Sequence, residues 1–347
     1  MKRNFKVILD ADDVLYDCAG EGVRRVNLEM GTDYAVQDIT QWGLLGNELD
    51  ERMDYFKEPK WILSLPVLPG AKQFVSDLSK EAEILVVTNV YPKCAGARMD
   101  ALIRDFPEIS PSNILIGGRK DLLHADVMLD DLPSNLEHAT GVEYPVLFRQ
   151  PWNYGKTGLY SVSKYDEFLT LVKMIKFGME ITPAMEYDSI VLTGPSGSGK
   201  KKLAEKLIRQ NPKIHRVTTY TTRQGGLGYR HVTEEEFTNL DLEGKFFEKS
   251  CYIGHRYGTC ENDINDVIHS GGIPLLIMDI NGMVAMKSRY TPLAIYVKAE
   301  REECIRDILC RDFPMDEMVQ RIMALDMEAR NEQFCDMTLS ADSDFSI

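Results

Sequence analysis

The sequence lacks several features that would place it in a broad class of protein. Its seven cysteines form no CxxC pair, so they indicate neither a disulfide framework nor a zinc site, and we expect a reducing compartment. No apolar run approaches the roughly 18 residues that a membrane span needs. The opening MKRNFKVILDADD is typical of a first strand and not of a signal peptide. We therefore expect a cytoplasmic protein with no membrane partner, in the host cytoplasm if the protein is viral.

Positive charge is scarce as well. The chain has 40 Lys and Arg against 54 Asp and Glu, a net charge of −14, which repels a long polyanion on average. We therefore expect small nucleotides as partners and no polymeric nucleic acid, because a local basic pocket suffices for a small phosphate ester. The sequence leaves the oligomeric state open, a homodimer included.

The length and the order of apolar segments predict an α/β protein of two domains. With 347 residues and 44% hydrophobic residues, the chain is long enough for two domains of roughly 150–190 residues each. Short apolar runs alternate with helical patterns, as in parallel sheets with crossover helices. The predicted domains are 1–178 and 189–347, joined by a linker at 179–188 that has no clear period. Strands are expected at 5–9, 83–88, 113–118, 126–131 and 144–149, and again at 189–194, 274–280 and 293–299.

Carboxylates follow two of the apolar runs in the first half. Asp10 and Asp12 come directly after the run at 5–9, and Asp130 and Asp131 follow a later run. Ligands bind at the carboxyl ends of strands in open α/β sheets. An aspartate can attack phosphorus, a second can transfer the proton, and Mg2+ prefers carboxylate oxygens.

A hydroxyl and an ammonium group complete this set. Thr88 ends the run EILVVT, and Lys120 precedes the second acidic pair. Both side chains can stabilise the charge that develops on a transferring phosphoryl group.

Taken in order, these motifs resemble the haloacid dehalogenase superfamily. DADDVL (10–15), ILVVTN (84–89), Lys120 and the acidic pair match its four motifs, and LPVLPGAKQFV and VLFRQPWN resemble its 5'(3')-deoxyribonucleotidases, including bacterial and phage relatives. The resemblance implies a Rossmannoid parallel sheet with a helical cap at about 16–64. It implies Asp10 as nucleophile, Asp12 as general acid and base, and Thr88 and Lys120 as phosphate ligands. The implied Mg2+ ligands are Asp10, the backbone of Asp12, and Asp130 or Asp131.

The second half opens with a glycine-rich phosphate loop. The segment SIVLTGPSGSGK reads as a strand, a turn and a helix that begins at about Lys200. Backbone N–H groups of such a turn point at phosphates, and the lysine reaches the β- and γ-phosphates of ATP. The expected ATP-binding residues of the loop are Gly194, Pro195, Ser196, Gly197, Ser198, Gly199, Lys200 and Lys201.

Downstream motifs resemble guanylate kinase, a nucleoside monophosphate kinase with a parallel sheet. The segments carrying the resemblance are TTYTTRQGGLGYRHVTEEEF, EGKFFEKSCYIGHRYGTC and LLIMDINGM. A carboxylate suits guanine, whose N1–H and exocyclic amine are donors. Arg306, Arg311 and Arg321 resemble arginines of the lid, with Arg311 expected at ATP. The resemblance implies a nucleoside monophosphate site built from Thr219, Arg223, Tyr229, Glu248, Tyr257, Thr259, Asp279 and Arg321.

The sequence departs from this family at two positions. Lys201 stands where the loop normally has a Ser or Thr that binds the metal, and a lysine only donates hydrogen bonds. The second acceptor arginine expected after TTR is replaced by the uncharged QGGLG. A kinase fold that only binds a ligand is therefore one alternative.

Together the halves predict a bifunctional enzyme of nucleotide metabolism. A Mg2+-dependent 5'-nucleotidase would be joined to an ATP-dependent monophosphate kinase, and with different substrates the two would edit a nucleotide pool, as a phage would need. A second alternative is a polynucleotide 5'-kinase/3'-phosphatase, which has the same order of domains.

Overall fold

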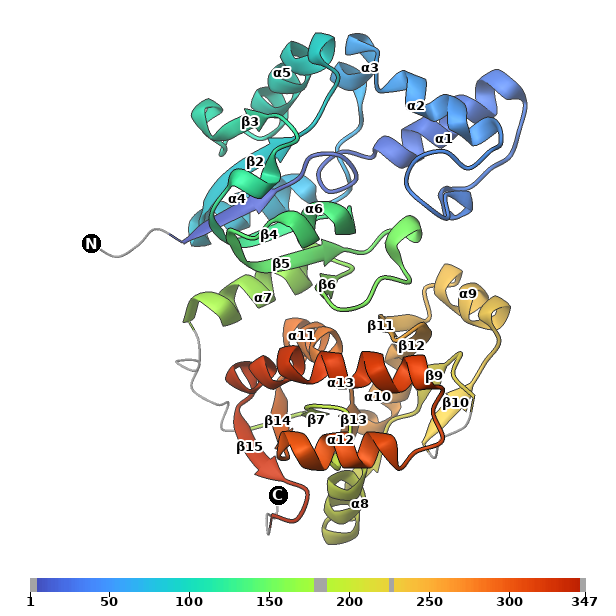
Figure 1. The fold of residues 1–347 in the computed structure, drawn as a ribbon, viewed down its shortest axis with the longest axis vertical. Helices are drawn as coiled ribbons and strands as arrows, with labels where there is room; N and C mark the ends of the chain where they lie inside the picture. The colour runs from blue at the N-terminus through green and yellow to red at the C-terminus, as the bar shows by residue number, and fades with distance from the viewer. Residues whose placement is uncertain (1–4, 178–185, 225–227, 344–347) are drawn as a thin grey trace. The chain divides into compact units, whose positions relative to one another are not determined.

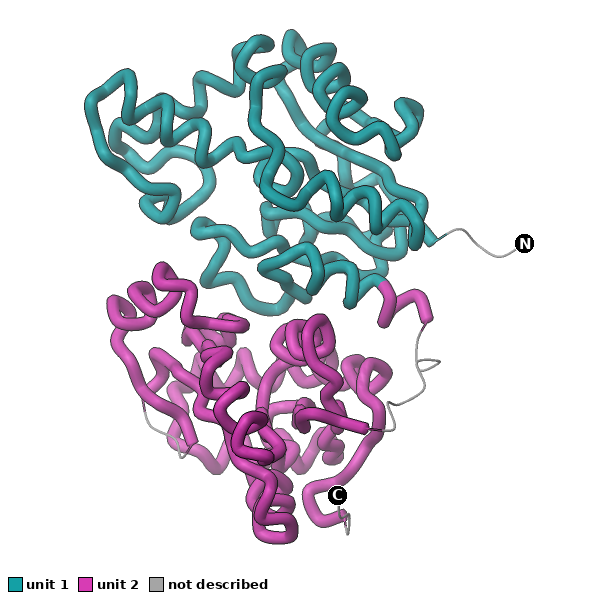
Figure 2. Tube along the Cα trace, turned by 180° about the vertical axis from the view of Figure 1, so that it is seen from behind, with its two compact units in different colours: residues 1–172 teal, residues 173–347 magenta. Residues whose placement is uncertain are grey.

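The computed structural model of the chain describes residues 5–177, 186–224 and 228–343. The chain divides into two units, residues 1–172 and 173–347, shown in separate colours in Figure 2. The division falls inside helix α7 (Tyr165–Phe177), before the expected linker at 179–188. Most of that linker lies outside the described residues, so the predicted domain limits stay a prediction.

Unit 1 is built on a six-stranded sheet with the order β3-β2-β1-β4-β5-β6, labelled in Figure 1. All five strand pairs are parallel, as expected for strands that are joined by crossover helices. The expected strands are present, and β6 is an additional short edge strand. The strands are β1 (Lys6–Leu9), β2 (Glu83–Thr88), β3 (Ile114–Ile116), β4 (Ala125–Asp130), β5 (Val142–Phe148) and β6 (Tyr160–Val162).

Helices cover this sheet and form a separate segment between β1 and β2. Helix α4 packs on β2, α5 on β3, and α6 on β4 and β5. The segment expected to form a cap, 16–64, is helical throughout its regular parts. The helices of unit 1 are α1 (Cys18–Met30), α2 (Arg52–Tyr55), α3 (Pro59–Ser64), α4 (Ala71–Glu81), α5 (Ala95–Asp105), α6 (Pro133–His138) and α7, with short 3-10 turns η1 (Val36–Asp38), η2 (Glu48–Glu51), η3 (Pro92–Cys94), η4 (Pro111–Asn113), η5 (Lys120–Leu122) and η6 (Pro151–Asn153).

Strands β1 and β4 are neighbours, and the chain leaves them in opposite directions across the sheet. The order continues from β1 to β2 and β3 on one side, and from β4 to β5 and β6 on the other. Such a reversal opens a crevice at the carboxyl ends of the two strands. The first acidic pair follows β1 and the second begins at the last residue of β4, so the topology brings them together.

Unit 2 contains a five-stranded parallel sheet of order β15-β14-β7-β13-β8. Here β7 is central, and the phosphate loop leaves its carboxyl end for helix α8, which packs on β7, β8 and β13. The strands are β7 (Ser189–Thr193), β8 (Ile214–Arg216), β13 (Ile273–Ile277), β14 (Pro292–Lys298) and β15 (Met337–Ser340).

A second, four-stranded sheet of order β10-β9-β12-β11 belongs to the same unit. It is mixed, because β11, β12 and β9 pair antiparallel whereas β10 and β9 pair parallel. Its strands are β9 (Thr219–Thr221), β10 (Tyr229–His231), β11 (Phe246–Tyr252) and β12 (His255–Cys260). The helices of unit 2 are α8 (Lys200–Gln210), α9 (Glu234–Leu242), α10 (Glu261–His269), α11 (Ile280–Arg289), α12 (Arg301–Leu309) and α13 (Met315–Ala329), followed by the 3-10 turn η8 (Arg330–Phe334).

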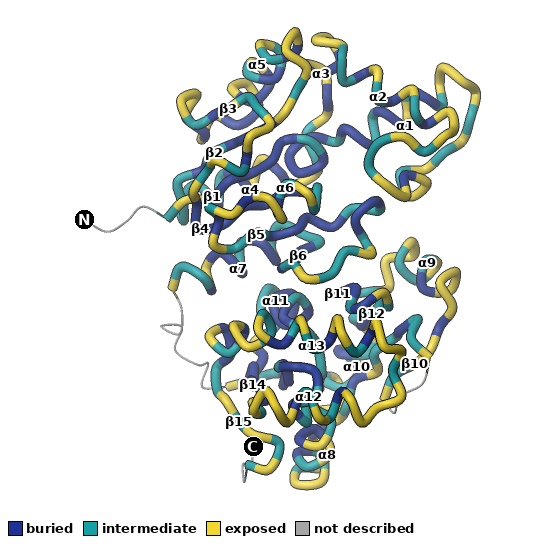
Figure 3. The backbone as a smooth tube through the Cα atoms, viewed as in Figure 1, coloured by how far each residue is buried: buried dark blue, intermediate teal, exposed yellow. Residues whose placement is uncertain are grey.

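Burial follows the parallel strands in both units, as the dark tube in Figure 3 shows. Every residue of β4 and of β7 is buried, which explains why apolar residues dominate both strands, although Asp126 of β4 is buried as well. In unit 2, Ile190, Leu192 and Ile295 of the sheet pack with Leu203 and Leu207 of α8. Among the described residues, none of the helices is long and apolar enough to cross a membrane. The prediction of two α/β domains with parallel sheets is confirmed.

Candidate functional sites

The acidic pairs of unit 1 meet at a buried lysine. Lys120 Nζ lies 2.6 Å from Asp10 Oδ1 and 2.6 Å from Asp130 Oδ2. All three side chains are buried, and Asp10 N donates to Leu129 O of β4 at 2.9 Å. The segments that supply them are therefore fixed by the sheet itself, and residues 110 and 10 positions apart converge on one point.

A third carboxylate, Asp131, completes a cluster that suits a divalent cation. Carboxylate oxygens of Asp10, Asp130 and Asp131 lie within 4.8 Å of one another. Burial raises the pKa of Asp10 to about 7 and raises that of Asp131 well above its usual range, and the neighbouring carboxylates add to both shifts. One lysine does not offset three buried carboxylates. The cluster therefore fits Mg2+, which binds hard oxygen ligands.

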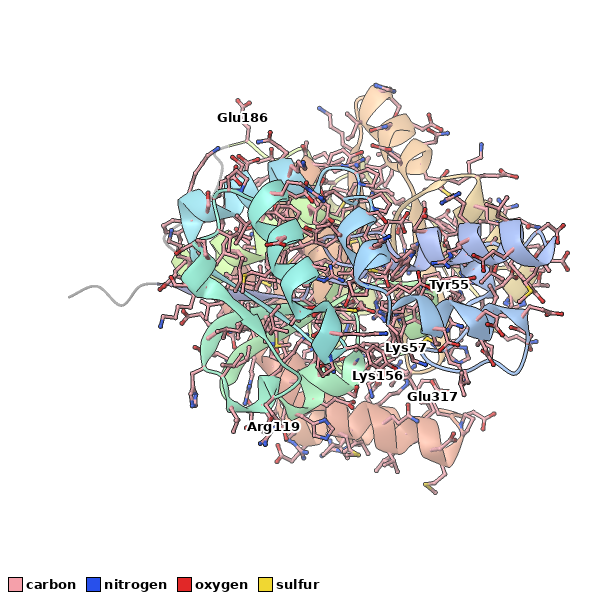
Figure 4. The ribbon with its side chains drawn as sticks, turned by 90° about the horizontal axis from the view of Figure 1, so that it is seen from above. Tyr55, Lys57, Arg119, Lys156, Glu186 and Glu317 are labelled. Carbon is pink, nitrogen blue, oxygen red and sulfur yellow. The ribbon has the colours of Figure 1, made fainter. Side chains whose placement is uncertain are left out.

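Lys120 contrasts with the residue beside it. Arg119, labelled in Figure 4, lies at the surface and pairs with Asp121 at 2.7 Å. Lys120 is turned into the unit, where burial alone would lower the pKa of its ammonium group, but Asp10 and Asp130 outweigh burial and raise it. Lys120 is therefore held in its charged form.

Thr88 occupies the last position of β2, next to β1. Its side chain is fully buried, and within the described residues its Oγ1 has no hydrogen-bond partner. A buried hydroxyl without a partner is rare and needs an explanation. A phosphoryl oxygen of a substrate would provide the missing acceptor.

The other carboxylate of the first motif, Asp12, faces a partner that the sequence did not reveal. Arg98 of α5 forms an ion pair with Asp12 Oδ1, and Cys18 Sγ donates to the same oxygen at 3.0 Å. Arg98 has no exposed surface, and its Nε and Nη1 have no partner among the described residues. The pair spans 86 positions, so no local motif signals it.

Further residues missed by the sequence hold the second acidic pair. Asn135 Nδ2 donates to Asp130 Oδ2 at 3.0 Å, and Leu132 N donates to Asp130 Oδ1 at 2.8 Å. Trp152 Nε1 donates to Asp131 Oδ2 at 2.9 Å. The ring of Trp152 in turn lies 5.5 Å from that of Trp42, which is only partly buried and belongs to the expected cap.

In unit 2, three glycines let the phosphate loop pass close to neighbouring backbone. Gly194, Gly197 and Gly199 have φ angles of 136°, 88° and 85°. A Cβ at Gly194 would lie 2.5 Å from Val297 O, and one at Gly197 would lie 2.7 Å from Cys304 O. Glycine is therefore required here for both backbone conformation and space. Ser198 Oγ is buried and has no partner among the described residues.

Lys200 is the first residue of α8, as predicted, and its ammonium group folds over the loop. Nζ donates to Gly194 O at 2.5 Å and to Pro195 O at 2.7 Å. Burial lowers its pKa to about 8, which Glu328 opposes. Lys200 is thus a half-buried cation whose partners in the loop are neutral.

Helix α13 contacts this loop at Ser196. Arg321 Nη1 donates to Ser196 Oγ at 3.1 Å, and Ser196 N donates to Glu328 Oε2 at 2.9 Å. Arg321 also binds Glu317, labelled on α13 in Figure 4, at 2.7 Å. Arg321 was expected at the acceptor nucleotide, but its hydrogen bond to Ser196 places it at the phosphate loop. Arg306 of α12 is exposed.

Four of the predicted nucleotide-binding residues lie in one row across the mixed sheet: Glu248, Thr219 and Thr259, expected at the base, and Tyr229, expected at the acceptor phosphate. Tyr229 pairs with Thr219, Thr219 with Thr259, and Thr259 with Glu248, one from each strand. Residues paired in register point to the same face. Thr259 Oγ1 donates to Glu248 Oε1 at 2.8 Å, and both residues are buried. This face presents a carboxylate, two threonine hydroxyls and a tyrosine hydroxyl together.

The remaining predicted residues surround this row or the end of β13. The ring of Tyr257, two residues before Thr259, lies 6.2 Å from that of Tyr229. The guanidinium groups of Arg223 and Arg311 lie 5.0 and 5.9 Å from the ring of Phe313, and Arg311 also pairs with Asp307. Asp279 follows β13 and caps α11 by accepting from Gly282 N at 2.9 Å.

Comparison with known proteins finds a separate match for each half. The sequence model described as "5' nucleotidase, deoxy (Pyrimidine), cytosolic type C protein" matches residues 3–177, and the one described as "Guanylate kinase" matches residues 186–343.

Individual relatives give the same division. The chain is 30% identical over 142 residues to a putative 5'(3')-deoxyribonucleotidase of Staphylococcus epidermidis, covering 38% of this chain and 76% of the relative. It is 28% identical over 168 residues to the 5'(3')-deoxyribonucleotidase of Bacillus phage SPbeta, covering 46% and 94%. It is 30% identical over 141 residues to the guanylate kinase of Desulfitobacterium hafniense, covering 38% and 70%. The chain therefore joins two enzyme families, since its first half belongs to the deoxyribonucleotidases of the haloacid dehalogenase superfamily and its second half to the guanylate kinases.

Proposed function

We propose that unit 1 removes the phosphate from (deoxy)nucleoside 5'-monophosphates and that unit 2 transfers a phosphate from ATP to a guanine-type monophosphate. The observation that carries the first activity is the buried cluster of Asp10, Asp130 and Asp131, with Lys120 bound to the first two. The second rests on the glycine loop with Lys200 in the same unit as the row from Tyr229 to Glu248.

In the phosphatase, Asp10 attacks phosphorus and the bond from phosphorus to the nucleoside oxygen breaks, leaving an acyl phosphate on Asp10. Asp12 donates a proton to the leaving oxygen and then accepts one from the water that hydrolyses the acyl phosphate. Thr88 and Lys120 hold the phosphoryl oxygens, and Arg98 keeps the Asp12 carboxylate in place. Bound Mg2+, held by Asp10, Asp130, Asp131 and the Asp12 backbone, would neutralise the charge of the phosphoryl group.

The nucleoside of the phosphatase substrate would lie against the cap. Trp152 joins Asp131 to the ring of Trp42, and aromatic faces stack on bases. Trp61 and Tyr16 are only 4% and 0% exposed and belong to the core.

In the kinase, backbone N–H groups of residues 194–199 and the Lys200 ammonium group hold the phosphates of ATP. Glu248 accepts from the N1–H and amine of guanine, and Thr219 and Thr259 lie beside it. Tyr257 and Arg223 hold the acceptor phosphate, and Arg311 and Arg321 stabilise the transferring group. Asp279, at the end of β13, faces the acceptor.

With different substrates the two activities would edit a nucleotide pool in the cytoplasm, removing one monophosphate and promoting another. The fusion of opposing activities supports this proposal, and similarity to a deoxyribonucleotidase from a phage fits a role in viral replication.

A substrate panel on the intact chain tests both activities. All common ribo- and deoxyribonucleoside monophosphates are incubated with Mg2+, with and without ATP, and inorganic phosphate and ADP are measured separately. We expect release of inorganic phosphate from one set of monophosphates, and formation of ADP from ATP when a guanine monophosphate is the acceptor. The same nucleotide preference in both assays would contradict pool editing. Absence of ADP would indicate that unit 2 is a kinase fold that only binds a ligand. Activity confined to a 3'-phosphorylated oligonucleotide, tested beside the mononucleotides, would indicate an enzyme that repairs strand ends.

A further inference from the structure

Lys201, the first departure of unit 2 from the guanylate kinase pattern, lies over the ring of Tyr229, the residue that directly follows the QGGLG segment in the sequence. Lys201 Nζ lies 5.0 Å from the centre of the Tyr229 ring, and Arg216 Cζ lies 5.4 Å from the same centre. Lys201 comes from the first turn of α8 and Arg216 from the end of β8. Two cations from separate elements therefore flank a tyrosine of the acceptor row.

Gly228 makes room for this arrangement. It precedes Tyr229 and has a φ angle of 82°, and a Cβ on it would lie 2.2 Å from Arg216 Cζ. The guanidinium group thus lies directly against the backbone that leads into β10. A side chain at position 228 would displace Arg216 from Tyr229.

Three arginines and one glutamate, Glu205, act on the charge of Lys201. Burial lowers the pKa of Lys201, and Arg216, Arg311 and Arg223 lower it further. Within the described residues neither Lys201 nor Arg223 has an ion-pair partner. Cations that repel one another at a partly buried place favour binding of an anion there.

We propose that Lys201 and Arg216 together bind the phosphate of the acceptor nucleotide and replace the arginine that the QGGLG segment lacks. This rests on the proposed function, because it assigns the acceptor site of the same kinase. The ligand is a phosphate monoester, which carries close to two negative charges at neutral pH. Arg216 supplies a planar group with several N–H donors, and Lys201 supplies a compact positive charge from the first turn of α8, next to the phosphate loop.

Equilibrium binding to the intact chain tests the pair. Isothermal titration calorimetry is carried out with dGMP and with deoxyguanosine, using Asp10→Asn as background and no divalent metal, so that the nucleotidase does not consume the ligand. The test variants are Lys201→Met and Arg216→Met, and circular dichroism verifies their folding. The matched controls are Lys202→Met, from the same helical turn, where the lysine pairs with exposed Asp342, and Arg230→Met, from β10, where the arginine lies over Tyr220.

We expect each test variant to weaken dGMP binding roughly tenfold to hundredfold, the range for loss of one charge-assisted hydrogen bond. Deoxyguanosine binding and both controls should be unchanged. Equal losses for the nucleotide and the nucleoside, no loss in either test variant, or no dGMP binding to unit 2 in the background chain would overturn the proposal. If the test variants lose affinity for dGMP but not for deoxyguanosine, and the chain forms no ADP from ATP and dGMP, the phosphate site formed by Lys201 and Arg216 is supported and only the proposed kinase activity is wrong.

Discussion

The proposed phosphate sites of the two units carry opposite charge. In unit 1, three buried carboxylates cluster together and two of them pair with one lysine, so the site carries excess negative charge. In unit 2, Lys200 and Lys201 follow the phosphate loop, and Arg216, Arg223 and Arg311 act on the charge of Lys201, so positive charge is already present. We therefore expect phosphate binding in unit 1 to depend on a metal, whereas unit 2 has much of the required charge in its own side chains.

This difference follows from the chemistry proposed for each unit. A nucleophilic carboxylate must approach a phosphate of like charge, and a cation between them removes the repulsion. A kinase only positions two phosphate groups and spreads the charge that develops, which arginine and lysine can do directly. The absence of a metal-binding hydroxyl at position 201 is consistent with this second strategy.

We expect the largest difference between the activities of the two units from the substitution Asp10→Asn. The substitution keeps size and removes the nucleophile, so release of phosphate from deoxynucleoside monophosphates should fall at least about 10^4-fold. ADP formation by unit 2 should be unchanged. The measurement is a phosphate assay beside an ADP assay on the same preparation.

Asp33→Asn is the matched control, because Asp33 is an exposed aspartate of the same unit. It should retain full phosphatase activity. Residual activity of Asp10→Asn above a few per cent of the parent chain would show that another group attacks phosphorus.

Lys120→Met tests the excess of negative charge in unit 1. Removing the lysine leaves Asp10 and Asp130 as buried carboxylates without a counter-ion, which should lower the free energy of unfolding by about 3–5 kcal/mol. Mg2+ should restore part of this loss by binding the carboxylates, so it should raise the unfolding temperature of the variant more than that of the parent chain. Differential scanning calorimetry with and without Mg2+ measures both effects.

The neighbouring variant Arg119→Met serves as control. Arg119 is 72% exposed in its pair with Asp121, so its loss should leave the unfolding temperature unchanged. An Lys120→Met chain that unfolds like the parent and gains nothing from Mg2+ would contradict the charge arrangement described for unit 1.

The smallest effect concerns pH and distinguishes the lysines of the two sites. Burial holds the pKa of Lys200 near 8, below its usual value, so the charged form that binds ATP declines as pH rises above 8. ATP affinity should then fall by up to about tenfold per pH unit between pH 8 and 10. The same depressed pKa disfavours the folded state at lower pH, so Lys200 destabilises unit 2 below pH 8 and this effect disappears as pH approaches 10.5.

Lys120 should not behave in this way, because its neighbours raise its pKa. Calorimetric titration of ATP from pH 7 to 9.5, with Lys202→Met as control, measures the slope. Constant ATP affinity over this range would show that Lys200 stays charged in unit 2.

The sequence predicted the parts of the molecule in which neighbours along the chain decide the structure. The buried strands β1, β2, β4 and β7 are continuous apolar runs, and α8 begins at Lys200 because a glycine turn ends there. Short edge strands such as β6 and β15 were missed, since three or four residues give no distinct period. Their pairing depends on the strand beside them.

The sites show the same limit. Asp10, Lys120 and Asp130 were predictable because each follows a recognisable strand or motif. Arg98 was not, because it reads as an ordinary charged residue of an amphipathic helix, and only the packing of α5 turns it towards Asp12. Arg216 likewise ends a short strand without a motif, and its role depends on Gly228 and Tyr229, which come later in the chain.

The attachment of α13 to Ser196 has a mechanical consequence. Arg321 and Glu328 are seven residues apart, so they lie on one face of α13, two turns from each other. Arg321 donates to the hydroxyl of Ser196, and Glu328 accepts from the backbone amide of the same residue. Helix α13 therefore cannot rotate about its axis without moving Ser196. We expect α13 and the phosphate loop to move together. Any closure of the proposed kinase site would then come from movement of the four-stranded mixed sheet.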